Sequence, residues 1–180
     1  MPAIRAEPIA PLIELTQSNV ENLGPQVLLL ADDSGQLSPF DILQPEYADA
    51  WTEHRARSIS RGYDDTPFWI QFRLDASQSI HKEWHLVLSN ALLDYVDVYQ
   101  VFGSSGPRLI YRSGLQRPSQ SRIEDHRFFI IPVEVYGPTT YLMRIETSPS
   151  ALVPLHAYPS DDFWSPLLKA DIGNWLFYGV

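Results

Sequence analysis

The sequence contains no cysteine among its 180 residues. Disulfide bridges and thiolate metal sites are therefore excluded as sources of stability. The absence suits an oxidising compartment such as the bacterial periplasm, where stray thiols would be paired by oxidants. It does not by itself assign the compartment.

Positive charge is also scarce. Lys and Arg number 13 against 22 Asp and Glu, which gives a formal net charge of -9. Nucleic-acid binding needs clustered Lys and Arg that neutralise phosphates, so this balance disfavours a nucleic-acid partner. It is compatible with cations or neutral sugars as ligands.

A long hydrophobic run is missing as well. The longest uncharged stretch near the C-terminus covers residues 172–180. A membrane helix needs about 20 residues, so this stretch is too short to span a bilayer.

The sequence does contain a series of short segments in which apolar and polar residues alternate. In residues 68–74, one face is apolar and the other carries Trp69, Gln71 and Arg73. A period of two is typical of a half-buried strand. The same pattern recurs further along, and a nearly continuous apolar run predicts a central strand at 127–135.

Eight or so such strands, separated by turn signals, predict an all-β fold. We expect an antiparallel, jelly-roll-like β-sandwich with short peripheral helices. Residues 1–24 are predicted to be a lead-in with an edge strand near 12–15, and residues 25–160 the sandwich domain. Residues 161–180 are predicted to lead toward a membrane helix that lies beyond this sequence.

The order and spacing of several segments resemble a known family. They are LLADDSG at 29–35, SRGY at 60–63, FWIQF at 68–72, WHLVL at 84–88, YVDVY at 95–99, Ser113-Gly114, Arg122, HRFFIIP at 126–132 and YLMRI at 141–145. The chain resembles 7TMR-DISMED2, a sensor module that precedes a seven-helix membrane region in bacterial receptors. These receptors include hybrid sensor histidine kinases of the RetS and LadS type.

The resemblance implies a ligand-sensing domain in a signal-transduction receptor, such as a histidine kinase of a two-component system. It implies a periplasmic location, as the extracytoplasmic part of an inner-membrane protein tethered through the sequence after Val180. Families of this type are linked to a carbohydrate-binding jelly roll, so the implied ligand is a small polar molecule, with carbohydrate as the leading class. The alternative is an interaction module that forms a homodimer or contacts another receptor without a small ligand.

The outward faces of the predicted strands carry the candidate ligand-binding residues. Sugars stack their C–H faces on aromatic rings, and their hydroxyls form hydrogen bonds with charged groups. We predict that such a surface is formed by Trp69, Gln71, Arg73, His85, Tyr95, Asp97, Tyr99, Arg144 and Glu146. The alternative is a plain solvated face, since antiparallel sheets normally have a polar side.

Arg122 is a further candidate, in the charged segment before the apolar run at 127–135. An arginine presents paired donors that could grip an anionic ligand. The alternative is a loop whose charges pair with Glu124 and Asp125.

Acidic doublets are candidates for binding calcium. They occur at 32–33, 64–65 and 161–162. Calcium takes six to eight oxygen ligands, so one doublet supplies too few, and turn or helix-cap roles explain all three. Asp64 and Asp65 are kept as candidate Ca²⁺ ligands at a rim loop, and no other cofactor is predicted.

Catalytic signatures are missing from the sequence. It contains no GxSxG, HExxH or Walker phosphate loop. Asp97 and Glu146 could form a glycosidase-like carboxylate pair, but a chain of this length offers many such pairs. We therefore expect no catalytic residues and a domain that is not an enzyme, although a full receptor could carry a kinase or cyclase output.

Overall fold

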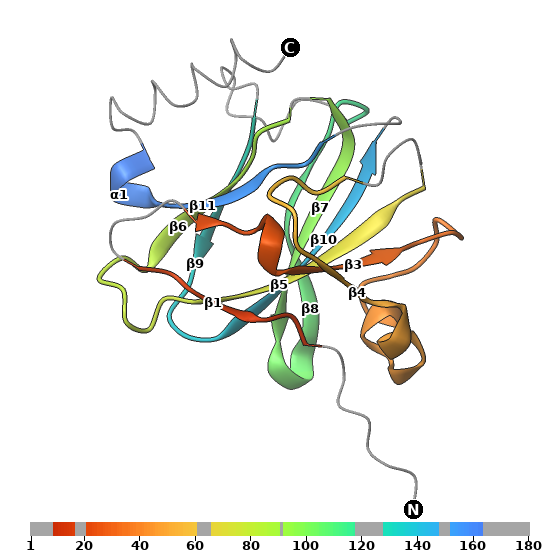
Figure 1. The fold of residues 1–180 in the computed structure, drawn as a ribbon, viewed down its shortest axis with the longest axis horizontal. Helices are drawn as coiled ribbons and strands as arrows, with labels where there is room; N and C mark the ends of the chain where they lie inside the picture. The colour runs from red at the N-terminus through yellow and green to blue at the C-terminus, as the bar shows by residue number, and fades with distance from the viewer. Residues whose placement is uncertain are drawn as a thin grey trace, which may run out of the picture.

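The computed structural model describes residues 9–16, 21–60, 66–90, 92–117, 128–147 and 152–163. Within these ranges the chain forms a seven-stranded and a four-stranded β-sheet, with only short helical segments at the periphery. Figure 1 shows how the strands are arranged. Buried residues of both sheets form a common hydrophobic core. The predicted all-β sandwich is thereby confirmed.

The larger sheet runs in the spatial order β4, β3, β5, β10, β7 and β8, and β1 pairs with the end of β5. The β1–β5 pair is parallel, and the other pairs of this sheet are antiparallel. Its strands are β1 (Leu12–Glu14), β3 (Val27–Ala31), β4 (Thr52–His54), β5 (Phe68–Asp75), β7 (Leu93–Phe102), β8 (Gly106–Ser113) and β10 (Thr139–Thr147).

The smaller sheet runs in the order β2, β11, β6 and β9 within the described ranges. Its strands are β2 (Glu21–Asn22), β6 (Glu83–Leu88), β9 (Phe129–Glu134) and β11 (Leu155–Pro159). The predicted lead-in contributes one short strand to each sheet, because β1 pairs with β5 and β2 pairs with β11.

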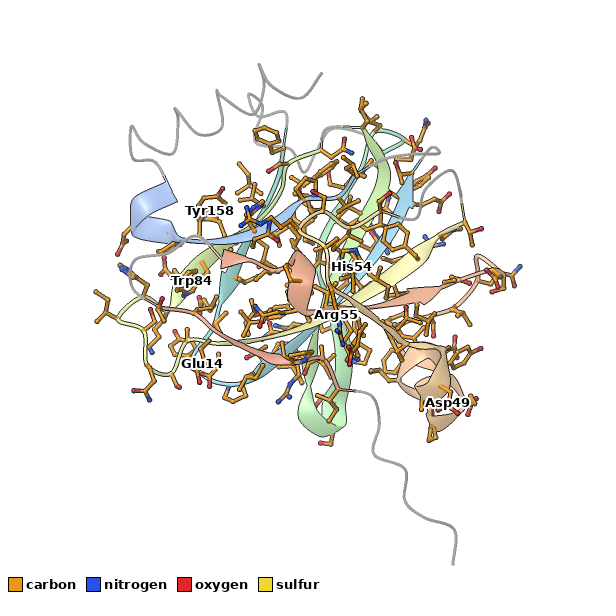
Figure 2. The ribbon with its side chains drawn as sticks, viewed as in Figure 1. Glu14, Asp49, His54, Arg55, Trp84 and Tyr158 are labelled. Atoms are coloured by element: carbon orange, nitrogen blue, oxygen red, sulfur yellow. The ribbon has the colours of Figure 1, made fainter. Side chains whose placement is uncertain are left out.

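Alternate side chains of both sheets fill the space between them (Figure 2). Trp84 of β6 is fully buried, and its indole N–H donates to the carbonyl of His81 at 3.1 Å. Phe72 of β5 stacks on Tyr141 of β10 with ring centroids 5.4 Å apart. Burial of one large apolar side chain contributes about 1.5–3 kcal/mol, so this core fixes which face of each strand points inward.

The prediction of a central strand at 127–135 is wrong, because β9 lies at the end of its sheet in the described part of the chain. Its apolar character has another origin. Ile131 faces the core between the sheets, whereas Ile130 packs on the other side of the strand with Val87 and Tyr158. Pro132 cannot donate a ladder hydrogen bond, and it is tolerated at a sheet edge.

Short helical segments connect the strands. They are η1 (Gly24–Gln26), η2 (Asp41–Leu43), η3 (Pro45–Ala50), η4 (Gly103–Ser105) and α1 (Ser160–Phe163). The backbone N–H of Asp41 donates to the Ser38 hydroxyl at 3.2 Å, and the Asp41 carboxylate accepts from the Ser38 N–H at 2.8 Å. This reciprocal pair starts η2, and Pro45 then begins η3 because its fixed φ suits a first helical turn.

A second, smaller core lies on the outer face of the larger sheet. Trp69 of β5 packs there with Leu142 of β10, and with Ile42 and Trp51, which come from the segment around η2 and η3. Ala10 belongs to the same cluster. The η2–η3 segment and the chain near residue 10 therefore cover part of a sheet face that would otherwise meet solvent.

Candidate functional site

The outer face of the larger sheet brings together most of the residues predicted to bind ligand. Trp69 pairs in register with Arg144, and Arg144 pairs with Asp97 on the next strand. Since residues two apart on a strand share a face, this row places all the candidates of β5, β7 and β10 on one side. These candidates are Trp69, Gln71, Arg73, Tyr95, Asp97, Tyr99, Arg144 and Glu146.

Asp97 is the centre of a charge cluster on this face. It is buried, and its carboxylate accepts hydrogen bonds from Arg112 at 3.1 Å and from Arg117. The Arg117 guanidinium also lies 5.0 Å from the centroid of the Tyr95 ring. Asp97 is thus satisfied by the chain itself, and the Tyr95 ring already has a cation against it.

Arg144 is likewise paired within the chain. Its guanidinium lies 3.2 Å from the Glu146 carboxylate and 3.9 Å from the buried Asp32 carboxylate, and it donates to the carbonyl of Gly35 at 3.1 Å. Asp32 also accepts from the Ser34 hydroxyl at 2.8 Å. The acidic doublet at 32–33 therefore contributes a turn residue that holds its loop against the sheet, in agreement with the turn alternative.

Trp69 does not form an open platform. Its side chain has 0% exposure, and its ring lies 5.8 Å from that of Tyr99 in a tilted arrangement. Burial raises the pKa of Tyr99, which keeps its phenol protonated. In this structure Trp69 supports the η2–η3 segment that covers it. Its proposed direct contact with a ligand stays a prediction.

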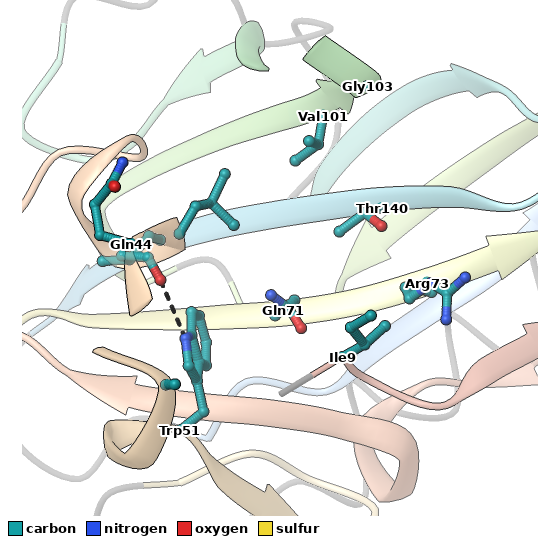
Figure 3. A pocket seen from close by; sticks show the side chains of 11 residues that line it. Ile9, Gln44, Trp51, Gln71, Arg73, Val101, Gly103 and Thr140 are labelled. Carbon is teal, nitrogen blue, oxygen red and sulfur yellow. Dashed lines mark hydrogen bonds between the residues drawn. The ribbon is translucent and has the colours of Figure 1, made fainter. Parts of the chain in front are cut away.

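A pocket of about 320 Å³ opens beside this second core (Figure 3). Gln71 and Arg73 lie along β5 on its floor, with Thr140 on the neighbouring strand β10. The rest of the lining is apolar apart from Gln44, and it consists of Ile9, Ile42, Leu43, Gln44, Ala48, Trp51, Val101 and Gly103. Small-molecule sites are typically cavities of a few hundred Å³ that are lined mainly by apolar side chains and contain a few polar groups.

Hydrogen bonds hold the cover of the pocket in place. The Trp51 indole N–H donates to the carbonyl of Ile42 at 3.2 Å, which ties the end of η3 to η2. The Gln71 side-chain oxygen accepts from the backbone N–H of Ala10 at 3.0 Å. The first bond joins the two helical segments of the cover, and the second connects the floor strand β5 to the chain near residue 10. Sequence reasoning missed this cover, and its only signal was the apolar residues around Pro45.

His85 does not join the other candidates. It lies on β6 of the smaller sheet, where Tyr158 of β11 is its register partner, and its Nδ1 lies 3.3 Å from the Ser160 hydroxyl oxygen. Burial lowers its pKa, and the nearby Glu83 partly opposes this effect. Arg122, Asp64 and Asp65 lie outside the described residues, so their proposed roles stay predictions.

The histidines of the smaller sheet predict a pH dependence of stability. Burial also lowers the pKa of His156, whose Nε2 lies 3.2 Å from the Asn22 amide nitrogen. A folded pKa below the unfolded value of about 6.5 means that the unfolded chain binds the proton first on acidification. Stability is therefore full above pH 6.5 and declines as the pH falls from there toward the folded pKa.

We expect the melting temperature to fall between pH 7.5 and 5.5 in scanning calorimetry. The His156→Gln variant, which cannot titrate, should show a smaller fall over the same range. A wild-type melting temperature that is constant across this range would contradict the prediction.

Two of the three acidic doublets, at 32–33 and 161–162, lie in the described ranges. No group of three or more His, Asp or Glu side chains is placed there to hold a metal ion. Asp161 of the third acidic doublet instead lies 3.1 Å from the Nδ1 of His81. The calcium hypothesis for Asp64 and Asp65 stays untested.

The chain forms a two-sheet β-sandwich, with a pocket on the outer face of its larger sheet. The family model described as 7TMR-DISM extracellular 2, or 7TMR-DISMED2, matches residues 24–159. The chain therefore belongs to this family, as the resemblance predicted.

Members of this family are extracellular, sensor-type modules of seven-transmembrane receptors, and such modules are typically non-catalytic. No curated protein matches the chain. Among the helices of the described residues, none has the length and apolar character needed to cross a membrane.

Proposed function

We propose that this chain is the periplasmic ligand-sensing domain of a bacterial membrane receptor, and that it binds a small polar ligand in the pocket over β5 and β10. Carbohydrate is the leading ligand class. The observation that carries the proposal is the combination of Gln71, Arg73 and Thr140 on the floor with Trp51 in the wall. Polar groups of this kind bind hydroxyls, while an aromatic or apolar wall accepts the C–H face of a sugar ring.

The construction of the pocket supports a sensing role. Its floor belongs to the rigid sheet, whereas its cover comes from η2, η3 and the chain near Ile9. A ligand that touches floor and cover binds one arrangement of the two better than others, which is the requirement for a population shift. Such a shift would be passed to the membrane region of the receptor, and then to an output such as a histidine kinase of a two-component system.

The competing function is an interaction module without a small ligand. β8 lies at the end of the larger sheet in the described ranges, and it exposes Leu109. An edge strand offers unpaired backbone groups to a second chain, which would permit a homodimer or a contact with another receptor. A Ca²⁺ sensor is the third possibility.

A thermal-shift screen separates these functions. The purified chain is tested against mono- and oligosaccharides, amino acids and Ca²⁺, because a ligand of the native state raises the melting temperature by mass action. At a ligand concentration of 100 times Kd this stabilisation is about 2.7 kcal/mol, enough for a shift of several degrees. We expect a dose-dependent shift with at least one small polar compound.

Two variants of η3 localise the binding. Ala48 lines the pocket, so Ala48→Trp should fill it and abolish the shift. Ala50 is exposed, lies on the same segment and is outside the lining, so Ala50→Trp should retain the shift. No shift with any compound would overturn the ligand-sensing proposal, and sedimentation analysis would then test the dimer.

A further inference from the structure

Arg73 differs from the other arginines on the outer face of the larger sheet. Arg112 and Arg117 both bind the Asp97 carboxylate. Arg144 lies against the carboxylates of Glu146 and Asp32. Among the described residues, nothing forms a hydrogen bond or ion pair with the Arg73 guanidinium, although its side chain is half-buried on the pocket floor.

The groups around Arg73 add further donors. Thr140 is its register partner on β10 and offers a hydroxyl. The side-chain oxygen of Gln71 accepts from the N–H of Ala10, so the Gln71 NH₂ is the end of this amide that remains for a ligand. In a chain of net charge -9, none of the described residues that line the pocket is acidic. The floor thus combines one unpaired cation with neutral donors.

We propose that the pocket selects a small molecule that carries a carboxylate, with Arg73 as the group that binds it. The inference rests on the proposed function and names the ligand class of that same site. A guanidinium presents parallel N–H donors that match the two oxygens of a carboxylate, and such charge-assisted pairs are the stronger hydrogen bonds. The apolar wall of Ile42, Leu43 and Trp51 receives the body of the ligand, which is a sugar ring or a short hydrocarbon.

The volume sets the size of this ligand. About 320 Å³ lies at the lower end of the range of small-molecule sites, which suits a single sugar acid or a small aromatic acid. A carboxylate on a sugar and one on a hydrocarbon present the same two oxygens to Arg73. The experiment therefore includes carboxylates of both kinds, on a sugar and on a hydrocarbon.

The test measures affinity by calorimetric titration of the 180-residue chain with matched acid and neutral compounds. The pairs are glucuronate with glucose, galacturonate with galactose, and benzoate with benzamide, at pH 7 and constant ionic strength. A hydrogen bond to a charged group is worth about 1.5–3 kcal/mol, so we expect one acid to bind about 10- to 100-fold more tightly than its neutral partner. The pair with the larger preference shows whether the pocket binds a sugar acid or an aromatic acid.

Three variants assign this preference to Arg73. Arg73→Gln should remove the acid preference, and Arg73→Lys should retain part of it because the charge stays while the paired donors are lost. Arg112→Ala is the matched control, since it removes the same charge from the same sheet face but lies outside the pocket lining. It should leave the preference unchanged.

The possible failures are distinguishable. If no acid binds more tightly than its neutral partner, or if Arg73→Gln keeps the preference, the inference is overturned. Binding of the neutral compounds in that case leaves the proposed function standing. If neither these pairs nor any compound of the wider screen binds, the proposed function falls together with the inference.

Discussion

The Trp69→Ala variant is expected to lose about 3–5 kcal/mol of unfolding free energy, the usual range for truncating a buried tryptophan. Trp69 has 0% exposure and packs in the second core with Leu142, Ile42 and Trp51. Removing the ring leaves a cavity between the sheet and its cover, which the surrounding residues can fill only in part. Urea unfolding followed by far-ultraviolet circular dichroism measures this loss.

Tyr136→Ala is a suitable control for this variant. Tyr136 is 65% exposed, so its truncation should change the unfolding free energy by no more than about 0.5 kcal/mol. A loss below about 1 kcal/mol in Trp69→Ala would show that the second core contributes little and would contradict the prediction. Because Trp69 supports the pocket cover, weaker ligand binding in this variant would not identify Trp69 as a ligand contact.

The second large effect is expected for Gly114→Ala, at the end of β8. Gly114 has a φ of +145°, which side chains other than glycine rarely adopt. An added Cβ would lie 2.7 Å from the carbonyl carbon of Asp94 and 2.8 Å from the Cα of Tyr95. Both atoms belong to the backbone of β7, which cannot move without disturbing its pairing with β8 and β10.

Backbone strain and overpacking each cost about 1–3 kcal/mol, so we expect Gly114→Ala to lose about 2–4 kcal/mol of unfolding free energy. Gly137→Ala is the matched control, because nothing lies within 4 Å of its added Cβ and its φ is not in the left-handed region. Its change should stay below about 1 kcal/mol. Equal urea midpoints for the two variants would contradict the prediction.

The predicted faces of the strands are correct where one side of a strand is apolar. In β5, Ile70 and Phe72 point into the main core, and Gln71 and Arg73 point outward, as the period of two predicts. The same pattern could not show that Trp69 is buried on the outward side. Its cover comes from Ile42 and Trp51, which follow no strand periodicity and precede β5 in the chain.

The position of His85 shows a second property that the alternation of a strand cannot predict. Alternation correctly places its side chain outside the core, because Trp84 and Leu86 on either side of it are buried. The alternation pattern contains no information about which sheet a strand joins. Pairing of β6 with β9 and β11 places His85 on the smaller sheet, away from the pocket.

The sequence by itself determined the all-β class, the family and the inward and outward faces of the main strands, because these depend on local alternation and on the order of segments. Only the tertiary structure decided which outward residues share a site. Asp32, which is distant in sequence, pairs with Arg144, and Asp97 binds Arg112 and Arg117. Arg73 is left without a partner among the described residues. Such pairings depend on strand order and register, which are set by the packing of the whole chain.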